Sequence, residues 1–278
     1  MDGPALRRAI SMARHAVVSY VVTTLPSWER DVDQGADLVV VAGGDGTVRK
    51  VLAQLSNPSM TFAIVPAGTA NNIARTLGLP VDDALAGIQW WNGDVEVRPY
   101  HLSTVRSKGR AQVLVEGAGL GCFAETIRQA DAIEAAPGAP VDVWRVWQEV
   151  LGDAREQALQ VVVDGCHVDG LYLAAHASQV REFGPNLTIA PRADPHREHV
   201  EVALVGAEHR GALRDYVDRR RRGQHPPPVS FPTMTGKFVR LRTPSVVATS
   251  CDDAATIDDT GDLAIEAATR PVRMLVPR

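Results

Sequence analysis

The clearest pattern in the chain is an apolar run followed by glycines and then by a helical periodicity. Leu38–Ala42 is an uninterrupted run rich in valine, typical of a strand that is buried on both faces of a parallel sheet. The apolar positions that follow recur at three- and four-residue spacing, which predicts the core stripe of a helix: Val48, Val51, Leu52 and Leu55. The glycine-rich segment Gly43–Thr47 joins the two.

A second strand, loop and helix follow the first. Thr61–Val65 predicts another buried strand, and Pro66–Asn72 leads from it into a helix that Gly78 and Pro80 close. Further elements are expected on either side: a helix over Ala5–Ile10, a strand over Val17–Val22 and a helix over Asp82–Trp91. Alternating strands and helices predict a three-layer α/β domain with a parallel sheet over residues 1–95.

The pattern changes near Val95, where short strand-like runs separated by turn residues begin to dominate. The expected strands are Val113–Val115, Leu159–Val163, Leu171–Ala175, Leu187–Ala190, Val200–Val205, Phe238–Leu241, Val246–Ala248, Leu263–Ile265 and Val272–Val276. Helices are expected over Val141–Leu151 and Glu208–Arg222. We predict a mostly antiparallel, sandwich-like β domain over residues 96–278, whose last few residues are candidates to return to the first domain.

Composition narrows the classes of protein. A net charge of −4 in 278 residues gives no reason to expect nucleic acid as a partner. Three distant cysteines without a Cys-x-x-Cys pair indicate a reducing cytoplasm rather than disulfides or a cysteine-built zinc site. No run approaches the roughly 18 apolar residues of a spanning helix.

The two loops carry the clearest chemistry. Glycines between a strand and a helix let a ligand approach the backbone, and free N–H groups at the helix start favour phosphate. Asp45 inside such a loop suggests Mg²⁺ or acid–base chemistry; the alternative is a tight turn with a helix-capping aspartate. Gly68 and Thr69 are expected at the same sheet edge, where open α/β sheets bind ligands. Asn71 and Asn72 are candidates to bind a base or ribose.

Four other features of the sequence give weaker indications of function. Gly117–Gly121 lacks the third glycine of a dinucleotide fingerprint and is interpreted as a close-packed turn. His196–His199 lacks the spacing of a metalloprotease motif. Arg219–Arg222 is either a solvated helix end or a contact for anionic lipid. Trp144 and Trp147 are expected in the core.

Taken together, the segments Val41–Val48 and Pro66–Arg75 resemble the diacylglycerol kinase catalytic domain family, which includes sphingosine kinases and bacterial lipid kinases. Weaker similarity continues through Gly119–Ala124, Gly184–Ala193 and Ile257–Thr260. The resemblance therefore covers almost the whole chain, and it implies the same two-domain layout.

The resemblance implies an ATP- and Mg²⁺-dependent kinase that phosphorylates a lipid hydroxyl such as that of diacylglycerol. The implied ATP-binding residues are Gly43, Gly44, Asp45, Gly46, Thr47, Val48, Arg49, Gly68, Thr69, Asn71 and Asn72, with Thr23 or Thr24 contacting the nucleotide. Asp45 and a carboxylate of the β domain, Asp258, Asp259 or Asp262, are the implied catalytic groups. Asp194 and Glu198 are the implied metal ligands.

The sequence also departs from the family pattern. The chain starts too late for the family's usual first strand and its Asn-Pro loop. A glutamate of the family is Lys50 here, an Asp-Gly metal turn is replaced by Asp194–Glu198 with Arg197 inside it, and Thr260 stands where the family has a second acidic residue. These changes keep open a catalytically impaired nucleotide- or lipid-binding relative; a kinase of a soluble metabolite such as NAD is a lesser alternative.

The expected partner is a lipid substrate, with a peripheral membrane surface and a homodimer as further options and no nucleic acid. The expected location is the cytoplasm, including the inner face of the membrane.

Overall fold

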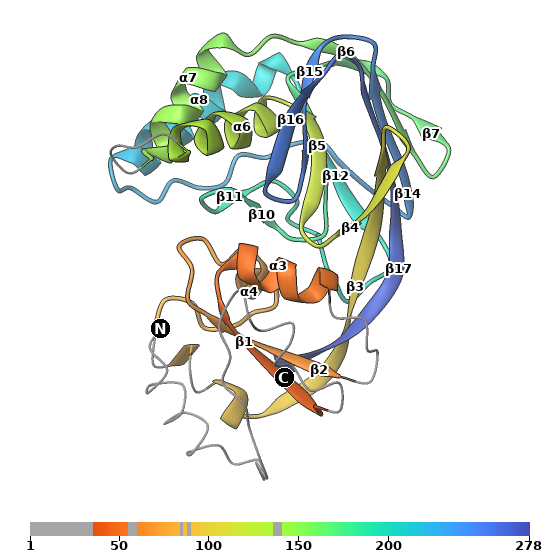
Figure 1. The fold of residues 1–278 in the computed structure, drawn as a ribbon. Helices are drawn as coiled ribbons and strands as arrows, with labels where there is room; N and C mark the ends of the chain where they lie inside the picture. Colours follow the sequence, from red (N-terminus) through yellow and green to blue (C-terminus); the bar gives the residue numbers. More distant parts are fainter. Residues whose placement is uncertain (1–35, 55–59, 84–85, 88–89, 136–140) are drawn as a thin grey trace. The chain divides into compact units, whose positions relative to one another are not determined.

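The computed structural model describes residues 36–278 except 55–59, 84–85, 88–89 and 136–140 (Figure 1). The described chain divides into two compact units: residues up to Tyr100 with Pro271–Arg278, and His101–Arg270. The expected elements over Ala5–Ile10 and Val17–Val22, together with Thr23 and Thr24, lie outside the described residues, and the expected helix over Asp82–Trp91 lies partly outside them. The functions assigned to residues 1–95 and 96–278 stay predictions.

The first unit contains the predicted strand–loop–helix pairs. Its elements are β1 (Leu38–Gly43), α3 (Asp45–Gln54), β2 (Thr61–Pro66), α4 (Asn72–Thr76) and the 3₁₀ turn η1 (Trp90–Asn92). β1 and β2 pair in parallel from Leu38 opposite Thr61 to Gly43 opposite Pro66, so both loops begin at one sheet edge. The α3 residues Val48, Val51 and Leu52 are buried, as their spacing predicts.

β1 is less buried than its sequence suggests. Only Val41 of its residues is fully buried, whereas the first five residues of β2 all are. Among the described strands β1 pairs only with β2, whereas β2 also pairs in parallel with the end of β17 (Gly261–Pro277), at Arg273 and Met274. A strand with neighbours on both sides loses more surface to water than one at an edge.

The second unit contains two antiparallel sheets. One has the strand order β13-β12-β9-β5-β15-β16, with β5 at Gly117–Gly121, β9 at Ala174–Ser178, β12 at Val200–Val205, β13 at Thr233–Gly236, β15 at Val247–Cys251 and β16 at Ala254–Asp258. The other pairs β17 with β14 (Phe238–Thr243), which pairs with β6 (Gln157–Val163). Its further strands are β3 (Val95–Ser107), β4 (Arg110–Leu114), β7 (Cys166–His167) and β8 (Gly170–Tyr172), and β17 also joins it to β2 and β1, so that these nine described strands form one mixed sheet.

Side chains from both sheets form one hydrophobic cluster, which confirms a sandwich-like arrangement within this unit. On β12, Val200, Val202 and Leu204 lie in this cluster, whereas the alternate residues Ala203 and Val205 lie in a second one. This division follows from the two-residue period of a strand. The six-stranded sheet is therefore covered on both faces.

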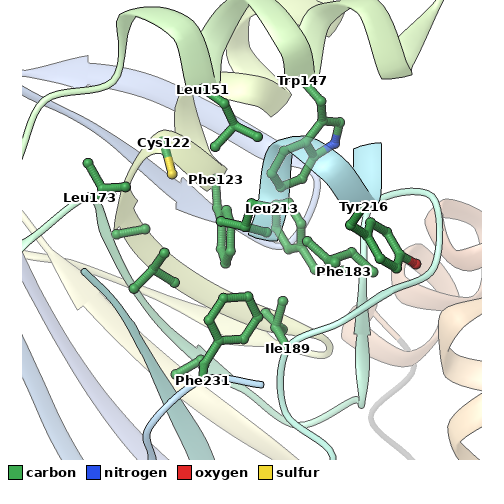
Figure 2. Close-up of a cluster of buried hydrophobic side chains, with 14 of the residues drawn as sticks. Cys122, Phe123, Trp147, Leu151, Leu173, Phe183, Ile189, Leu213, Tyr216 and Phe231 are labelled. Carbon is green, nitrogen blue, oxygen red and sulfur yellow. The ribbon is translucent and has the colours of Figure 1, made fainter. Parts of the chain in front are cut away.

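Helices cover its second face (Figure 1). They are α6 (Cys122–Glu134), α7 (Val143–Asp153) and α8 (Arg210–Arg221), with the 3₁₀ turn η2 (Ala207–His209) before α8 and the hairpin of β10 (Glu182–Phe183) and β11 (Leu187–Thr188) nearby. Figure 2 shows the aromatic centre of this second cluster, where Phe123 lies 5.3 Å from Trp147 and 5.2 Å from Phe183 between ring centroids. Trp147 is a core residue, as expected, whereas Trp144 is only half-buried.

The interpretation of Gly117–Gly121 as a turn was wrong, because this segment is β5, between β9 and β15. The close packing was right, and it explains the glycines. A Cβ atom on Gly117 would lie 2.5 Å from Nε2 of His176, and one on Gly119 would lie 2.5 Å from Nδ1 of the same ring. The two glycines leave the space that the imidazole of His176 occupies.

His176 makes stability depend on pH. It is buried, its Nδ1 has no hydrogen-bond partner among the described residues, and burial lowers its pKa to about 3. The unfolded chain protonates this ring below about pH 6.5, whereas the folded chain keeps it neutral down to about pH 3. The unfolded state therefore binds more protons, so the free energy of unfolding falls with decreasing pH in this window.

We expect this group to remove about 1.4 kcal/mol of stability for each pH unit below about 6. Urea unfolding of the wild type and of His176→Gln between pH 6.5 and 4.5 measures the difference in slope. A matched His225→Gln variant, changed at an exposed histidine, should keep the wild-type slope. Equal slopes for all three proteins would contradict a neutral, buried His176.

Candidate active site

The first loop is a tight turn from β1 into α3. The carbonyl of Gly44 accepts the amides of Thr47 at 3.0 Å and Val48 at 3.1 Å, and a Cβ on Gly43 would lie 2.6 Å from Cβ of Thr47. The amides at the start of a helix lack partners within the helix, and the helix dipole makes this end favourable for anions. Because the amides of Thr47 and Val48 are used inside the turn, the backbone donors that the loop offers to a negatively charged group are those before Thr47.

The second loop lies directly beside the first. The amide of Ala67 donates to the carbonyl of Gly43 at 3.0 Å, which extends the β1–β2 pairing by one bond. Gly68 and Thr69 follow and are exposed. The exposed hydroxyl of Thr69 is thus available to a ligand held at the sheet edge.

The two loops touch at their glycines. A Cβ on Gly68 would lie 2.4 Å from Cα of Gly44, and a Cβ on Gly44 would lie 2.9 Å from Cα of Gly68. Both distances are to backbone atoms, which cannot move aside as the end of a flexible side chain can. Only glycine allows the two backbones to approach so closely.

Asp45, in the first loop, forms hydrogen bonds with the second loop and the helix that follows it. Its Oδ2 accepts the amide of Asn72 and its Oδ1 accepts the amide of Ile73, each at 2.9 Å. Burial raises the pKa of Asp45, while the backbone hydrogen bonds lower it in part. Asp45 therefore has a capping role, which the sequence left open. It caps α4, because the first two amides of that helix donate hydrogen bonds to its carboxylate from a distant part of the chain.

Asn71 closes its own loop. Its Oδ1 accepts the amide of Gly68 at 2.9 Å, its Nδ2 donates to the Gly68 carbonyl at 2.8 Å, and its backbone is left-handed with a φ of 55°. Asn71 and Asn72 are both buried, and the side chain of Val48 is a core residue. The predicted contacts of these residues with a nucleotide stay predictions. In the structure, the side-chain amide of Asn71 forms hydrogen bonds inside its own loop.

The candidate carboxylates of the second unit differ in their partners. Asp258 is buried, lies 2.5 Å from Nζ of Lys108 and accepts Oγ1 of Thr249 at 2.7 Å. Burial raises the pKa of Asp258, but the bonds from Lys108, Thr249 and Thr256 outweigh this, so the pKa lies below its usual value. Asp258 thus links the end of β16 to the turn between β3 and β4.

Asp262 and Asp259 lie beyond β16. Asp262 forms a two-pronged ion pair with Arg240, at 3.0 and 2.7 Å, which lowers its pKa. Asp259 lies exposed in the turn between β16 and β17, and no ion pair of the described residues includes it. Of the three carboxylates, Asp259 is the one that remains accessible.

The predicted metal ligands Asp194 and Glu198 each lie beside a cation, and their role stays a prediction. Oδ2 of Asp194 lies 3.4 Å from Nε of Arg197, and Oε2 of Glu198 lies 2.6 Å from Nζ of Lys237. Each carboxylate is thus matched by a cation. Within the described parts of the chain, no group of three or more histidine, cysteine or acidic side chains is placed to hold a metal ion.

Sequence reasoning missed the partners of these groups. Lys108 lies 150 residues from Asp258, and no spacing or motif joins them. The contact between Gly44 and Gly68 was predicted in part, because both loops were expected at the same sheet edge. The hydrogen bonds of Asp45 have a recognisable sequence signal, because an acidic residue beside the start of a helix often accepts hydrogen bonds from backbone amides.

Comparisons with known proteins find similarity over much of the chain. The family model described as "Diacylglycerol kinase catalytic domain" matches residues 9–98. A diacylglycerol kinase of Mycobacterium tuberculosis is 24% identical over 221 residues, which is 77% of this chain and 70% of that protein. A probable lipid kinase YegS-like of Pseudomonas putida is 26% identical over 187 residues, 66% of this chain and 61% of that protein.

A shorter and closer match covers part of the chain. A diacylglycerol kinase of Bacillus subtilis is 48% identical over 52 residues, which is 18% of this chain and 17% of that protein. Among solved structures, a diacylglycerol kinase from Bacillus anthracis aligns with a TM-score of 0.61 and 16% identity, over 90% of this chain and 80% of that one. This confirms the mixed α/β fold with a parallel segment followed by antiparallel sheets. Residues 9–98 therefore match the diacylglycerol kinase catalytic domain family, as the two loops predict, and the chain is similar to a diacylglycerol kinase over most of its length.

Proposed function

We propose that this chain is a kinase that transfers the γ-phosphoryl group of ATP to a hydroxyl group of a lipid such as diacylglycerol. The observation that carries the proposal is the contact of two glycine loops, Gly43–Thr47 and Gly68–Asn72, at one sheet edge of the first unit. The family relationship supports a lipid kinase in general terms. The nucleotide and the individual lipid are our proposal.

In this proposal the loops bind the phosphates of ATP. Backbone amides at the start of α3 and the hydroxyl of Thr69 donate to phosphate oxygens, and the arginine side chain of Arg49 on α3 adds positive charge. Asp45 acts by positioning, because its two oxygens keep the second loop against the first. Phosphoryl transfer depends mostly on such positioning and on charge stabilisation.

Asp259 is the residue that we propose as acceptor of the proton from the lipid hydroxyl. A general base needs an accessible carboxylate without a fixed cation. Asp258 is buried against Lys108, and Asp262 is paired with Arg240, so both carboxylates already have a partner. Asp259 is exposed at a turn, where a substrate can reach it.

Magnesium enters this proposal as part of the substrate. ATP reaches kinases as its Mg²⁺ complex, in which the ion bridges phosphate oxygens. Asp194 and Glu198 are not assigned to this ion, because Arg197 and Lys237 already match their charges.

A second candidate function is nucleotide or lipid binding without turnover. The ion pairs of Asp258 and Asp262 favour it, since they occupy two of the three carboxylates in the region where the family resemblance implies the catalytic acid. It predicts ATP binding without phosphorylated lipid.

The experiment is transfer of label from [γ-³²P]ATP to a lipid panel of diacylglycerol, monoacylglycerol, ceramide and sphingosine in neutral detergent micelles. We expect label in the product of one glycerolipid with the wild type. Two matched variants, Asp259→Asn and Asp253→Asn, each remove one exposed carboxylate. Their comparison separates a catalytic role of Asp259 from the effect of losing any negative charge in this region.

We expect Asp259→Asn to lower kcat at least about 100-fold and leave KM for ATP within about twofold. Asp253→Asn should behave like the wild type. Transfer to no lipid, together with normal ATP binding, would reject the kinase in favour of the second candidate. Normal transfer by Asp259→Asn would reject the role of Asp259 alone.

A further inference from the structure

α8 and the residues just after it concentrate positive charge in an otherwise acidic protein. Six arginines and two aspartates lie between Arg210 and His225, whereas the whole chain has a net charge of −4. We define the arginine patch as Arg214, Arg219, Arg220, Arg221 and Arg222, with Trp144 of α7 beside them. A local excess of this kind lets an acidic protein approach an anionic surface from one side.

Several of these charges are not neutralised by the protein. Arg221 pairs with Asp142 at 3.0 Å, and Arg219 lies 3.7 Å from Asp215. Among the ion pairs of the described residues, none includes Arg214, Arg220 or Arg222. The remaining acidic neighbours also have partners: Asp218 accepts Gln148 at 2.5 Å, and Glu149 pairs with Arg145 at 2.8 Å. Arg220 Nη1 also lies 2.9 Å from Nδ1 of His225, which carries no negative charge, so the surface keeps three guanidinium charges for an external anion.

Trp144 gives the patch an aromatic component. The guanidinium carbon of Arg220 lies 5.4 Å from the centroid of the Trp144 ring, which is half-buried and forms a T-shaped pair with Tyr216. Tryptophan is enriched where protein meets the polar part of a bilayer, and arginine binds phosphate groups in a two-pronged manner. The two neighbours thus suit the same kind of surface.

A recess opens within the patch. Its volume is about 570 Å³, and its lining includes Trp144, Gln148, Arg221 and Arg222. The carboxylates of Asp142 and Asp218 also line it: Asp142 pairs with Arg221, whereas Asp218 accepts a hydrogen bond from the neutral amide of Gln148 and keeps its negative charge. This volume lies in the range of small-molecule sites and gives room for a lipid headgroup between two arginines.

We propose that the arginine patch, along α8 and at the start of α7, docks the protein on the surface of an anionic bilayer. The inference rests on the proposed function in one respect, since a kinase of a lipid hydroxyl must work at a membrane. Within the described residues, no helix is long and apolar enough to span a bilayer. A charged surface that binds phosphate-bearing headgroups provides the contact instead.

The test is co-sedimentation of the full chain with sucrose-loaded vesicles, without ATP or diacylglycerol. One vesicle type is pure phosphatidylcholine, and the other contains about one third phosphatidylglycerol. The test variant is R214Q/R220Q/R222Q. The control variant, R110Q/R155Q/R242Q, removes the same charge at exposed arginines outside the patch. Thermal unfolding verifies that each variant is folded.

We expect the wild type to bind anionic vesicles at least about tenfold more tightly than neutral ones and to be released when NaCl rises from 0.1 to 0.5 M. The patch variant should bind anionic vesicles about 100-fold more weakly, and the control should stay within about threefold of the wild type. Equal binding of the wild type to both vesicle types, or equal losses in both variants, would overturn the proposal. The salt series on the wild type needs no variant, so misfolding cannot obscure the answer.

Activity in neutral detergent micelles separates this inference from the proposed function. A patch variant that phosphorylates lipid in micelles but does not bind vesicles supports both. A wild type that binds anionic vesicles but transfers no phosphate keeps the docking surface and rejects the kinase. A wild type that transfers phosphate but ignores anionic vesicles keeps the kinase and rejects the docking surface.

Discussion

Replacement of Gly68 by alanine is expected to lower ATP affinity about 100-fold. The new Cβ would lie 2.4 Å from Cα of Gly44 and 2.9 Å from Oδ1 of Asn71. The first contact is with backbone, so the loops must separate, and the second disturbs the side chain that closes the loop. Overpacking of this kind costs about 1–3 kcal/mol, and the phosphate donors on both sides lose their common geometry.

Isothermal titration calorimetry with MgATP measures this effect, and Gly152→Ala is the matched control. Gly152 lies in α7, and a Cβ there would meet no atom within 4 Å. Alanine at that helical position should leave ATP affinity unchanged and raise stability by about 0.5–1 kcal/mol. Wild-type ATP affinity in Gly68→Ala would show that the contact of the two loops is not needed for the nucleotide.

Replacement of Asp45 by asparagine has the second-largest expected effect, a loss of ATP affinity of about 30-fold. Both oxygens of the carboxylate accept amides, from Asn72 and Ile73 at 2.9 Å. Asparagine offers one oxygen and one donor group, so one amide must face another donor. A hydrogen bond to a charged group contributes about 1.5–3 kcal/mol, and its loss frees the start of α4.

Hydrogen exchange separates this role from catalysis. We expect the amides of Asn72 and Ile73 to exchange at least about tenfold faster in Asp45→Asn, in the absence of any nucleotide. Asp82→Asn, which changes a carboxylate that is 84% exposed and pairs with Arg75, should leave both amides unchanged. If Asp45→Asn lost activity while both amides kept wild-type protection, Asp45 would act on the reaction and not on the loop.

The strands and helices around the loops could be predicted because local pattern and tertiary packing agree there. Leu38–Ala42 and Thr61–Val65 are apolar runs bounded by glycine or proline, and the observed strands begin at the same residues. Gly78 adopts a φ of 74° just after α4, as its position at the helix end implies. In such segments the hydrophobic period and the turn residues indicate the same boundary.

β17 could not be predicted as one strand. The sequence indicates two runs, Leu263–Ile265 and Val272–Val276, with Pro271 between them, yet β17 runs without interruption from Gly261 to Pro277. It pairs with β14 up to Glu266 and with β2 from Arg273, so the residues between lie where one partner gives way to the next. Ala268 has a φ of 59° in this interval. Local sequence does not record such a change of partner.

α6 was missed for a related reason. Glycine-rich Gly117–Gly121 suggested a turn, and the helix that begins at Cys122 directly after it went unrecognised. Gly117 and Gly119 are needed because the ring of His176, more than fifty positions away, fills the space of a side chain there. No local turn requires them. The partners of Asp258 and Glu198 escaped prediction in the same way, since ion pairs between residues far apart in the sequence leave no local pattern.

The most direct test of the central claim is hydrogen exchange of the full chain with and without MgATP. If the two loops form one phosphate site, ATP should protect amides of Gly43–Thr47 and Gly68–Asn72 together, with one dissociation constant and one nucleotide per chain. Adenosine, which lacks phosphates, should protect neither loop. Protection of one loop without the other, or equal protection by adenosine, would contradict a shared phosphate site.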